Sequence, residues 1–236
     1  MSAPSTSEIV MLTSAAPTDG IQEAKQPSQE TSVCRPNLFH RWLRLQELES
    51  ERAVTSCMVS PRSLLAFRFI VALYYTAVLI AALVFYKTTF FSFLTTISST
   101  SLCVYMWVAS YHSFMYCRHK NTNSIDSLFW VLKMGFWFHY ISLPCFHSLI
   151  TTTYWIFLYA GFENLPVYFI WVDLSLHAFA IFIVLGEVLL ARYQFPVRFW
   201  FVPVLLLVLY MFLTWFIHAI WHYWVYSFLG VDLKGM

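Results

Sequence analysis

The chain has 236 residues, of which 59% are hydrophobic and only 11% are charged. Soluble domains contain about half apolar and about a quarter charged residues, so this composition excludes an ordinary soluble domain and favours a membrane protein. The net charge of +2, without a basic stripe, predicts no nucleic-acid partner. The five cysteines are scattered and form no C-x-x-C pair, which argues against a disulfide framework or a structural zinc site.

The N-terminal part divides into two segments by composition. Residues 1–36 are rich in Ser, Thr, Pro, Glu and Gln and predict a disordered tail, and their short apolar run is too short for a signal peptide. In residues 37–62, leucines and aromatic residues alternate with arginines. That pattern predicts an amphipathic juxtamembrane segment on the membrane surface, with an ordinary solvated helix end as an equal alternative.

Residues 63–229 predict an all-α bundle of transmembrane helices, followed by a short tail at 230–236. A span needs about 20 apolar residues. Pro144 lies near the middle of the third candidate span, which we expect to be one kinked helix because no polar loop interrupts it. We expect five spans, with a sixth missing. The candidates are Leu64–Tyr86, Phe90–Tyr116, Leu128–Tyr159, Phe169–Tyr193 and Phe199–Ile220.

The distribution of Lys and Arg predicts the orientation. These residues gather before the first span, in the second loop and in the fourth loop, whereas the third loop, GFENLP, has none. Cytoplasmic loops carry the excess of positive charge. We therefore expect the N-terminus to be cytoplasmic. The expected location of the protein is the endomembrane system, such as the endoplasmic reticulum, or the plasma membrane.

The apolar stretch of the fourth span carries Asp173, His177 and Glu187. An Asp at the centre of a span raises the free energy of insertion by roughly 2.5–3.5 kcal/mol, so such residues usually have a function. Asp173 and His177 are four residues apart and share one helix face. Glu187 lies near the cytoplasmic end, close to Arg192, where an interfacial ion pair or a packing role is expected.

The stretch DLSLHAFAIFIVLGEVLLARYQFP resembles the androgen-induced (FAR-type) membrane protein family and its Rolling-stone-like relatives. In that pattern an intramembrane His is followed ten positions on by an acid and then by a Pro, as are His177, Glu187 and Pro196 here. The Asp four residues before the His, Asp173 here, resembles the Rolling-stone-like pattern. The pattern of the androgen-induced branch is similar but has Asn at that position. The segments SPRSLLAFRFIVALYY, ISLPCFHSLITTTYWIFLY and HYWVYSFLG also resemble the family.

The resemblance implies an intramembrane threonine hydrolase that cleaves lipid esters, such as fatty acid esters of hydroxy fatty acids. It implies no cofactor and no metal, and membrane lipids and a lipid ester as partners. The family's catalytic His matches His177. Its Thr, early in the second span, best matches Thr95, although further hydroxyl residues follow at Thr96, Ser98, Ser99, Thr100 and Ser101.

Chemistry and depth agree with this assignment. His177 is suited to take a hydroxyl proton, and Asp173 to orient its imidazole. Thr95 lies about 8 Å past Phe90, and His177 about 12 Å past Phe169, at 1.5 Å per residue. If both spans begin at the non-cytoplasmic face, the two depths differ by about one helical turn. The oxyanion donor is open, with Thr96 and Ser99 as possibilities.

Other interpretations compete with the hydrolase. His218 and His222 form an i,i+4 pair that suits a metal, although histidines at a membrane boundary are the better explanation. A second hypothesis is that His139 and His147, together with His112 or His177, bind a haem between helices. The alternative to an enzyme is a non-enzymatic membrane protein of the Rolling-stone-like type, with an adaptor, fusion, signalling or transport role.

Overall fold

The computed structural model describes residues 49–159, 161, 165–192, 197–226 and 229. The expected tails at 1–36 and 230–236 lie outside this part of the chain, as does the first half of the expected juxtamembrane segment, 37–48. The second half of that segment contains one short helix, α2, Ser50–Val54.

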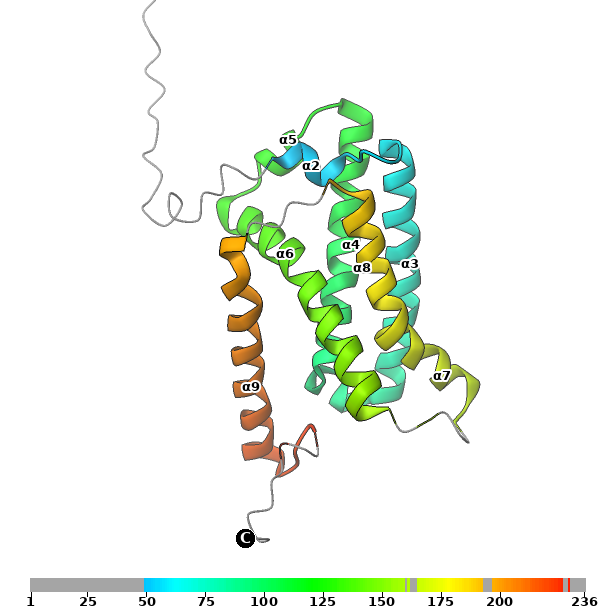
Figure 1. Cartoon of the computed structure of the whole chain (residues 1–236), viewed down its shortest axis with the longest axis vertical. Coiled ribbons are helices and arrows are strands. Elements are labelled where there is room, and N and C mark those ends of the chain that lie inside the picture. Colours follow the sequence, from blue (N-terminus) through cyan, green and yellow to red (C-terminus); the bar gives the residue numbers. More distant parts are fainter. Residues whose placement is uncertain (1–48, 160, 162–164, 193–196, 227–228, 230–236) are drawn as a thin grey trace, which may run out of the picture. The chain divides into compact units, whose positions relative to one another are not determined.

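The described chain is helical and contains no strand, which confirms the expected all-α class (Figure 1). Its longer helices run alongside one another as a bundle. A 3₁₀ turn, Lys87–Ser92, joins the first two long helices. After α2, the helices are α3 Pro61–Tyr86, α4 Leu94–His119, α5 Asn123–Asp126, α6 Trp130–Thr153, α7 Val167–Leu174, α8 Ala180–Leu190 and α9 Phe201–Trp221.

Helix α3 begins where local signals predict a helix start. The hydroxyl of Ser60 accepts a hydrogen bond from the backbone N–H of Ser63 at 3.1 Å, and Pro61 occupies the first helical position. Proline suits that position because its missing N–H has no partner there in any helix. The expected start at Leu64 was therefore three residues late.

In the described chain, four helical stretches are long and apolar enough to cross a membrane: Pro61–Ser92, Trp130–Leu158, Val167–Leu190 and Phe201–Trp221. The chain is therefore a multi-pass membrane protein. The stretches correspond to the first, third, fourth and fifth expected spans. The second expected span corresponds to helix α4, which is long enough at 26 residues but is not among these four, because its many Ser, Thr and His side chains make it less apolar.

Helix α4 lies at the centre of the bundle, in contact with α3 and α6 (Figure 1). It buries a row of polar side chains there, among them Ser98, Ser99, Ser110 and Ser113. Polar side chains hold helices together in a membrane because they bond to one another away from lipid. The composition that makes α4 a weak candidate span thus suits it to the interior.

The third and fourth expected spans are each one continuous helical stretch. Helix α6 contains Pro144 in its interior and continues as a π-helical turn, Tyr154–Leu158. A second π-helical turn, Ser175–Phe179, joins α7 to α8. Such turns occur often at functional sites because they shift the side chains that follow relative to a regular helix. His177 lies inside the second of these turns.

A buried ion pair joins α3 to α8. The guanidinium of Arg68 donates to the Glu187 carboxylate at 2.5 and 3.1 Å and to the hydroxyl of Ser113 at 2.6 Å. The hydroxyl of Tyr105 also donates to this carboxylate, at 2.8 Å. The partner of Glu187 is therefore Arg68 and not the neighbouring Arg192, because the helix face that carries Glu187 turns into the bundle.

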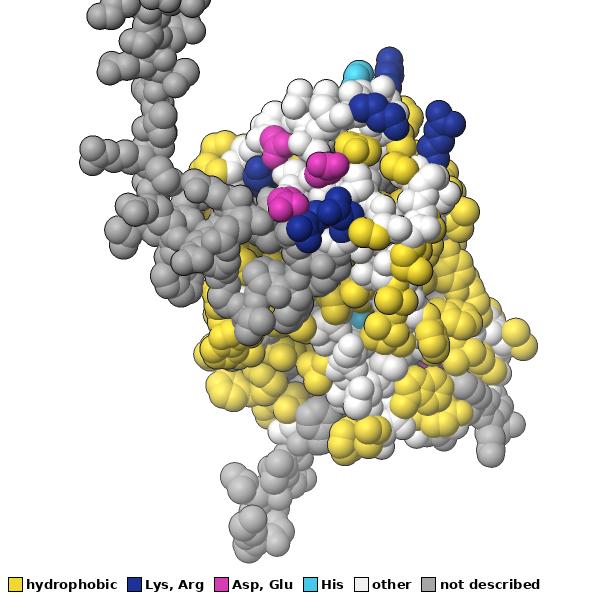
Figure 2. Space-filling model, turned by 45° about the horizontal axis from the view of Figure 1, so that its top comes forward, with side chains coloured by type: hydrophobic (Ala, Val, Ile, Leu, Met, Phe, Trp, Pro, Cys, Tyr) yellow, Lys and Arg dark blue, Asp and Glu magenta, His cyan; other side chains and the backbone are white. Residues whose placement is uncertain are grey.

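Charged side chains gather at the end of the bundle that carries α2 and α5, and hydrophobic side chains cover the sides that face the viewer (Figure 2). At this end, Asp126 accepts hydrogen bonds from Ser50 at 2.7 Å, Thr122 at 2.5 Å and Lys133 at 3.1 Å. Partial burial alone would raise the pKa of Asp126, but these three bonds hold the pKa below its usual range.

Candidate functional site

One cavity brings together Thr95, Asp173 and His177, the three residues that the sequence predicts to act as a unit. Its volume is about 210 Å³, and it lies where the beginning of α4 meets the α7–α8 stretch and the end of α6. The remaining lining residues are Tyr86, Phe93, Thr96, Tyr154, Leu158, Leu176 and Tyr226.

Asp173 holds one nitrogen of the His177 ring. Nδ1 of His177 lies 3.2 Å from the carboxylate Oδ1 of Asp173 and 3.0 Å from the Asp173 backbone oxygen. An Nδ1–H held in this way leaves Nε2 as the unprotonated nitrogen that accepts a proton. Nε2 has no hydrogen-bond partner within the described chain. The pair therefore presents an imidazole in the form that a general base requires.

Tyr154, at the end of α6, completes this arrangement. Its ring stacks on the His177 ring with centroids 3.7 Å apart and planes at 14°. Its hydroxyl donates a hydrogen bond to the other carboxylate oxygen of Asp173. One tyrosine thus restrains the ring plane of His177 and the orientation of Asp173. Sequence reasoning missed this residue, although an aromatic residue at the matching end of the third span was a usable signal.

Thr95 differs from the other hydroxyl residues near the start of α4. Its hydroxyl has no hydrogen-bond partner in the described chain, and the residue lines the cavity. Thr96 also lines the cavity, but its hydroxyl donates to the Phe93 backbone oxygen at 3.0 Å and to the Phe90 backbone oxygen. Thr100 donates to the Thr96 backbone oxygen at 2.7 Å. Its unbonded hydroxyl, in a residue that lines the same cavity as His177, distinguishes Thr95 from these neighbours.

The serines that follow do not line this cavity. Ser98 lies 3.3 Å from Nε2 of His147, and Ser101 lies 2.9 Å from Nε2 of His139. Ser99 is fully buried without a partner, and it does not line the cavity. Among the hydroxyl residues near the start of α4, Thr95 and Thr96 line the cavity, and of these two the Thr96 hydroxyl is already bonded to the backbone.

The histidines of the competing interpretations have partners other than His177. His139 and His147 each bond a serine of α4, and His112 lies 3.1 Å from the hydroxyl of Ser124. The ring of His218 stacks on Trp224, with centroids 3.9 Å apart. Across the described residues, no three His, Cys, Asp or Glu side chains gather as a metal site would require.

Fold and cavity together define an α-helical multi-pass membrane protein with a polar, partly buried Thr–His–Asp group near one end of its bundle. Comparisons with protein-family models, with curated proteins and with solved structures give no match for this chain. The resemblance to the androgen-induced and Rolling-stone-like proteins therefore stays a prediction from the quoted motifs.

Proposed function

We propose that the chain is an intramembrane hydrolase of lipid esters, with Thr95 as nucleophile, His177 as general base and Asp173 as the residue that orients it. The observation that carries the proposal is the shared cavity: a free Thr hydroxyl and an imidazole with one nitrogen held by a carboxylate line the same space. A hydroxyl becomes nucleophilic when such a base takes its proton.

The reaction would proceed in two balanced halves. The Thr95 oxygen attacks the ester carbonyl carbon while its proton passes to Nε2 of His177. The tetrahedral intermediate then collapses, and the alcohol leaves with that proton. Water attacks the resulting Thr95 ester, again giving a proton to His177. The free fatty acid leaves, and the proton returns to the Thr95 oxygen.

The oxygen that becomes negatively charged requires a donor. Thr96 suits this role poorly because its hydroxyl already donates to backbone oxygens, and Ser99 does not line the cavity. Tyr86 lines the cavity, and its hydroxyl has no hydrogen-bond partner in the described chain. We assign Tyr86 as the donor, because a positioned O–H group stabilises a developing oxyanion by hydrogen bonding.

A membrane setting is part of the proposal. Loops one and three would face the lumen or the exterior, so the cavity would lie in the non-cytoplasmic half of the bilayer. Lipid esters are the expected substrates because the bundle is surrounded by lipid, and the expected location is the endomembrane system or the plasma membrane.

Labelling with a fluorophosphonate probe tests the proposal directly. The full chain in detergent is expected to react at the Thr95 oxygen, Thr95→Ala is expected to abolish labelling, and His177→Ala is expected to slow it by about 10²- to 10⁴-fold. Thr100→Ala is the matched control, since its hydroxyl bonds its own helix and does not line the cavity. Labelling that is absent from the wild type, or equal in all three variants, would refute the hydrolase and favour the non-enzymatic alternative.

A further inference from the structure

Two further cavities, of about 300 Å³ each, lie along α9 where it faces α4 and α6. We call the cavity of Thr95, Asp173 and His177 the catalytic cavity, and name the other two by their distance from it. The near cavity is lined by residues such as Thr95, Ile150, Thr153 and Met211. The far cavity is lined by residues such as Ser98, Leu143, Leu206 and Leu209. Each alone has the volume of a small ligand site.

The three cavities form a series. The catalytic cavity and the near cavity share Thr95, Tyr154, Leu158 and Tyr226 as lining residues. The near and far cavities share Leu94 and Tyr210. The catalytic and far cavities share none, so the near cavity lies between them. Thr95 therefore belongs to both the catalytic cavity and the first part of the path along α9.

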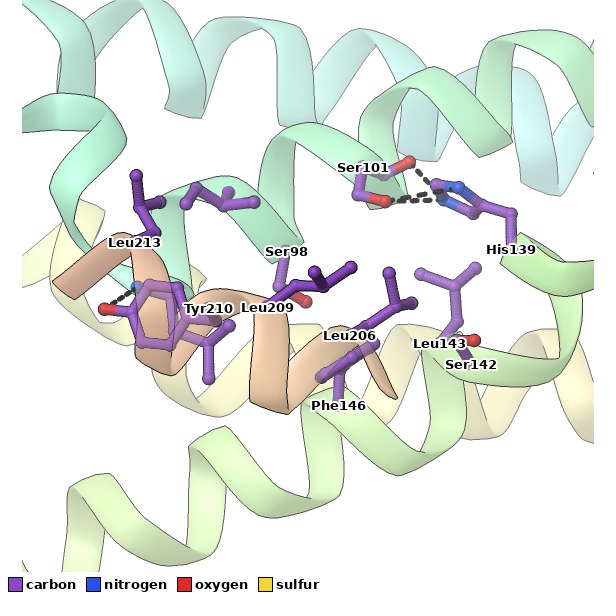
Figure 3. A pocket seen from close by; sticks show the side chains of 12 residues that line it. Ser98, Ser101, His139, Ser142, Leu143, Phe146, Leu206, Leu209, Tyr210 and Leu213 are labelled. Atoms are coloured by element: carbon purple, nitrogen blue, oxygen red, sulfur yellow. Dashed lines mark hydrogen bonds between the residues drawn. The ribbon is translucent and has the colours of Figure 1, made fainter. Parts of the chain in front are cut away.

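The path presents an apolar wall to a ligand. Figure 3 shows the far cavity, where Leu206 and Leu209 of α9 lie opposite Ser98 and Leu143. Its polar side chains are already engaged within the protein. Ser101 bonds His139 at 2.9 Å, and the hydroxyl of Ser142 donates to the Phe138 backbone oxygen at 2.7 Å. A ligand in this space meets few unsatisfied polar groups.

The length of the path also suits one kind of ligand. Along α6 the lining runs from Thr153 to His139, or about 21 Å at 1.5 Å per residue. Half of a hydrocarbon core of about 30 Å is about 15 Å, the reach of one lipid tail. The path therefore accommodates a complete fatty acyl chain.

We propose that the near and far cavities bind the acyl chain of a long-chain ester, with its carbonyl at Thr95 and its far end between Leu143 and Leu209. This rests on the proposed function, since it is Thr95 that anchors one end of the chain. A long acyl chain fills the path, whereas a short one leaves part of its lining without packing contacts, so the path favours long chains over short ones.

Substitutions on α9 test the assignment. Leu206→Trp and Leu209→Trp place an indole in the far cavity, whereas Leu205→Trp is the matched control because Leu205 lines none of the three cavities. The full chain in detergent is assayed with 4-methylumbelliferyl butyrate and with the corresponding palmitate. The two cavity variants are expected to lower the palmitate-to-butyrate rate ratio about tenfold or more, and the control to leave it unchanged.

A second readout does not depend on catalysis. A palmitate ester with a diazirine at the far end of its chain is photo-crosslinked to the full chain, and the labelled peptides are identified. Labelling is expected in 139–146 or 206–213 and is expected to fall in Leu209→Trp but not in Leu205→Trp. Labelling that is equal in both variants would indicate surrounding lipid and overturn the assignment.

The outcomes separate the two proposals. Thr95-dependent hydrolysis with an unchanged chain-length ratio in both cavity variants would refute the acyl-chain path and leave the hydrolase standing. Specific crosslinking without hydrolysis of either ester would refute the hydrolase and leave a binding site for an acyl chain.

Discussion

The His177 and Tyr154 rings lie nearly parallel, 3.7 Å apart between centroids, and the Tyr154 hydroxyl donates to the carboxylate that holds His177 Nδ1. The imidazole is therefore restrained from two directions, by a flat ring against its face and by Asp173 at its edge. A general base benefits from such restraint because a small misplacement of a reacting group lowers the rate steeply.

The two contributions of Tyr154 can be separated. Tyr154→Phe keeps the stacked ring and removes the hydrogen bond to Asp173, whereas Tyr154→Leu removes both. We expect hydrolysis to fall modestly in Tyr154→Phe and by a further factor of about ten in Tyr154→Leu, because the imidazole then loses its packing surface. Steady-state rates with the butyrate ester measure this. Equal rates in the two variants would show that the ring stack does not position His177.

The ion pair between Arg68 and Glu187 is expected to stabilise the fold. Both side chains are buried, with 0% and 4% of their surfaces exposed. Arg68→Leu leaves the Glu187 charge unpaired and is expected to lower the free energy of unfolding by about 3–5 kcal/mol. Thermal unfolding in detergent measures the loss.

The double variant is the decisive control for that pair. Arg68→Leu combined with Glu187→Leu removes both charges and is expected to regain much of the lost stability, because no buried charge is left without a partner. Arg62→Leu, at an exposed position of α3, is expected to change little. A double variant that is as unstable as the sum of the two single variants would contradict this account.

Asp126 is expected to give the charged end of the bundle a pH-dependent stability. Its pKa is lowered because the bonds from Thr122, Ser50 and Lys133 outweigh the effect of burial. The stabilisation is therefore complete above the ordinary pKa of an Asp and is lost as the pH falls through the lowered pKa. Melting temperatures between neutral and acidic pH are expected to decline less in Asp126→Asn than in the wild type. Glu51→Gln, an exposed neighbour on α2, serves as the control.

The orientation can be tested with cysteines. Cys57 is exposed just before α3. In sealed microsomes whose cytoplasmic face is outward, a chain with Cys57 as its one cysteine is expected to react with a membrane-impermeant maleimide without detergent. Leu165→Cys, in a cysteine-free background, is expected to react only after detergent is added, because it lies in the third loop. The reverse pattern would invert the topology and move the cavity to the cytoplasmic half.

The positions of the long helices followed closely from hydropathy. The fourth expected span began at Phe169 and the helix begins at Val167, while α9 begins at Phe201 against an expected Phe199. Helix boundaries depend on nearby residues, so a sequence pattern predicts them well. The weak apolarity of α4 was harder to interpret, because its serines find partners only on helices that are distant in the sequence.

The residues of the candidate site were recognisable in part from the sequence. Asp173 and His177 were recognisable because ionisable groups in a span need a reason to be there. The same signal was available for Arg68 inside the first span and was missed. Tyr154 and Tyr86 carried only a weaker signal, their position at helix ends, because aromatic residues are common at the ends of membrane helices. Their roles depend on which residues they meet.

Sequence patterns alone were sufficient to predict the class of the protein, the approximate helix boundaries and the spacing of Asp173 and His177 on one helix face. These properties follow from composition and from the fixed geometry of a helix. By contrast, the packing of the helices was needed to show that Arg68 pairs with Glu187, that Tyr154 stacks on His177 and that Thr95 shares their cavity. The period of a helix specifies which residues share a face, but the neighbour of that face depends on how side chains from distant segments pack together.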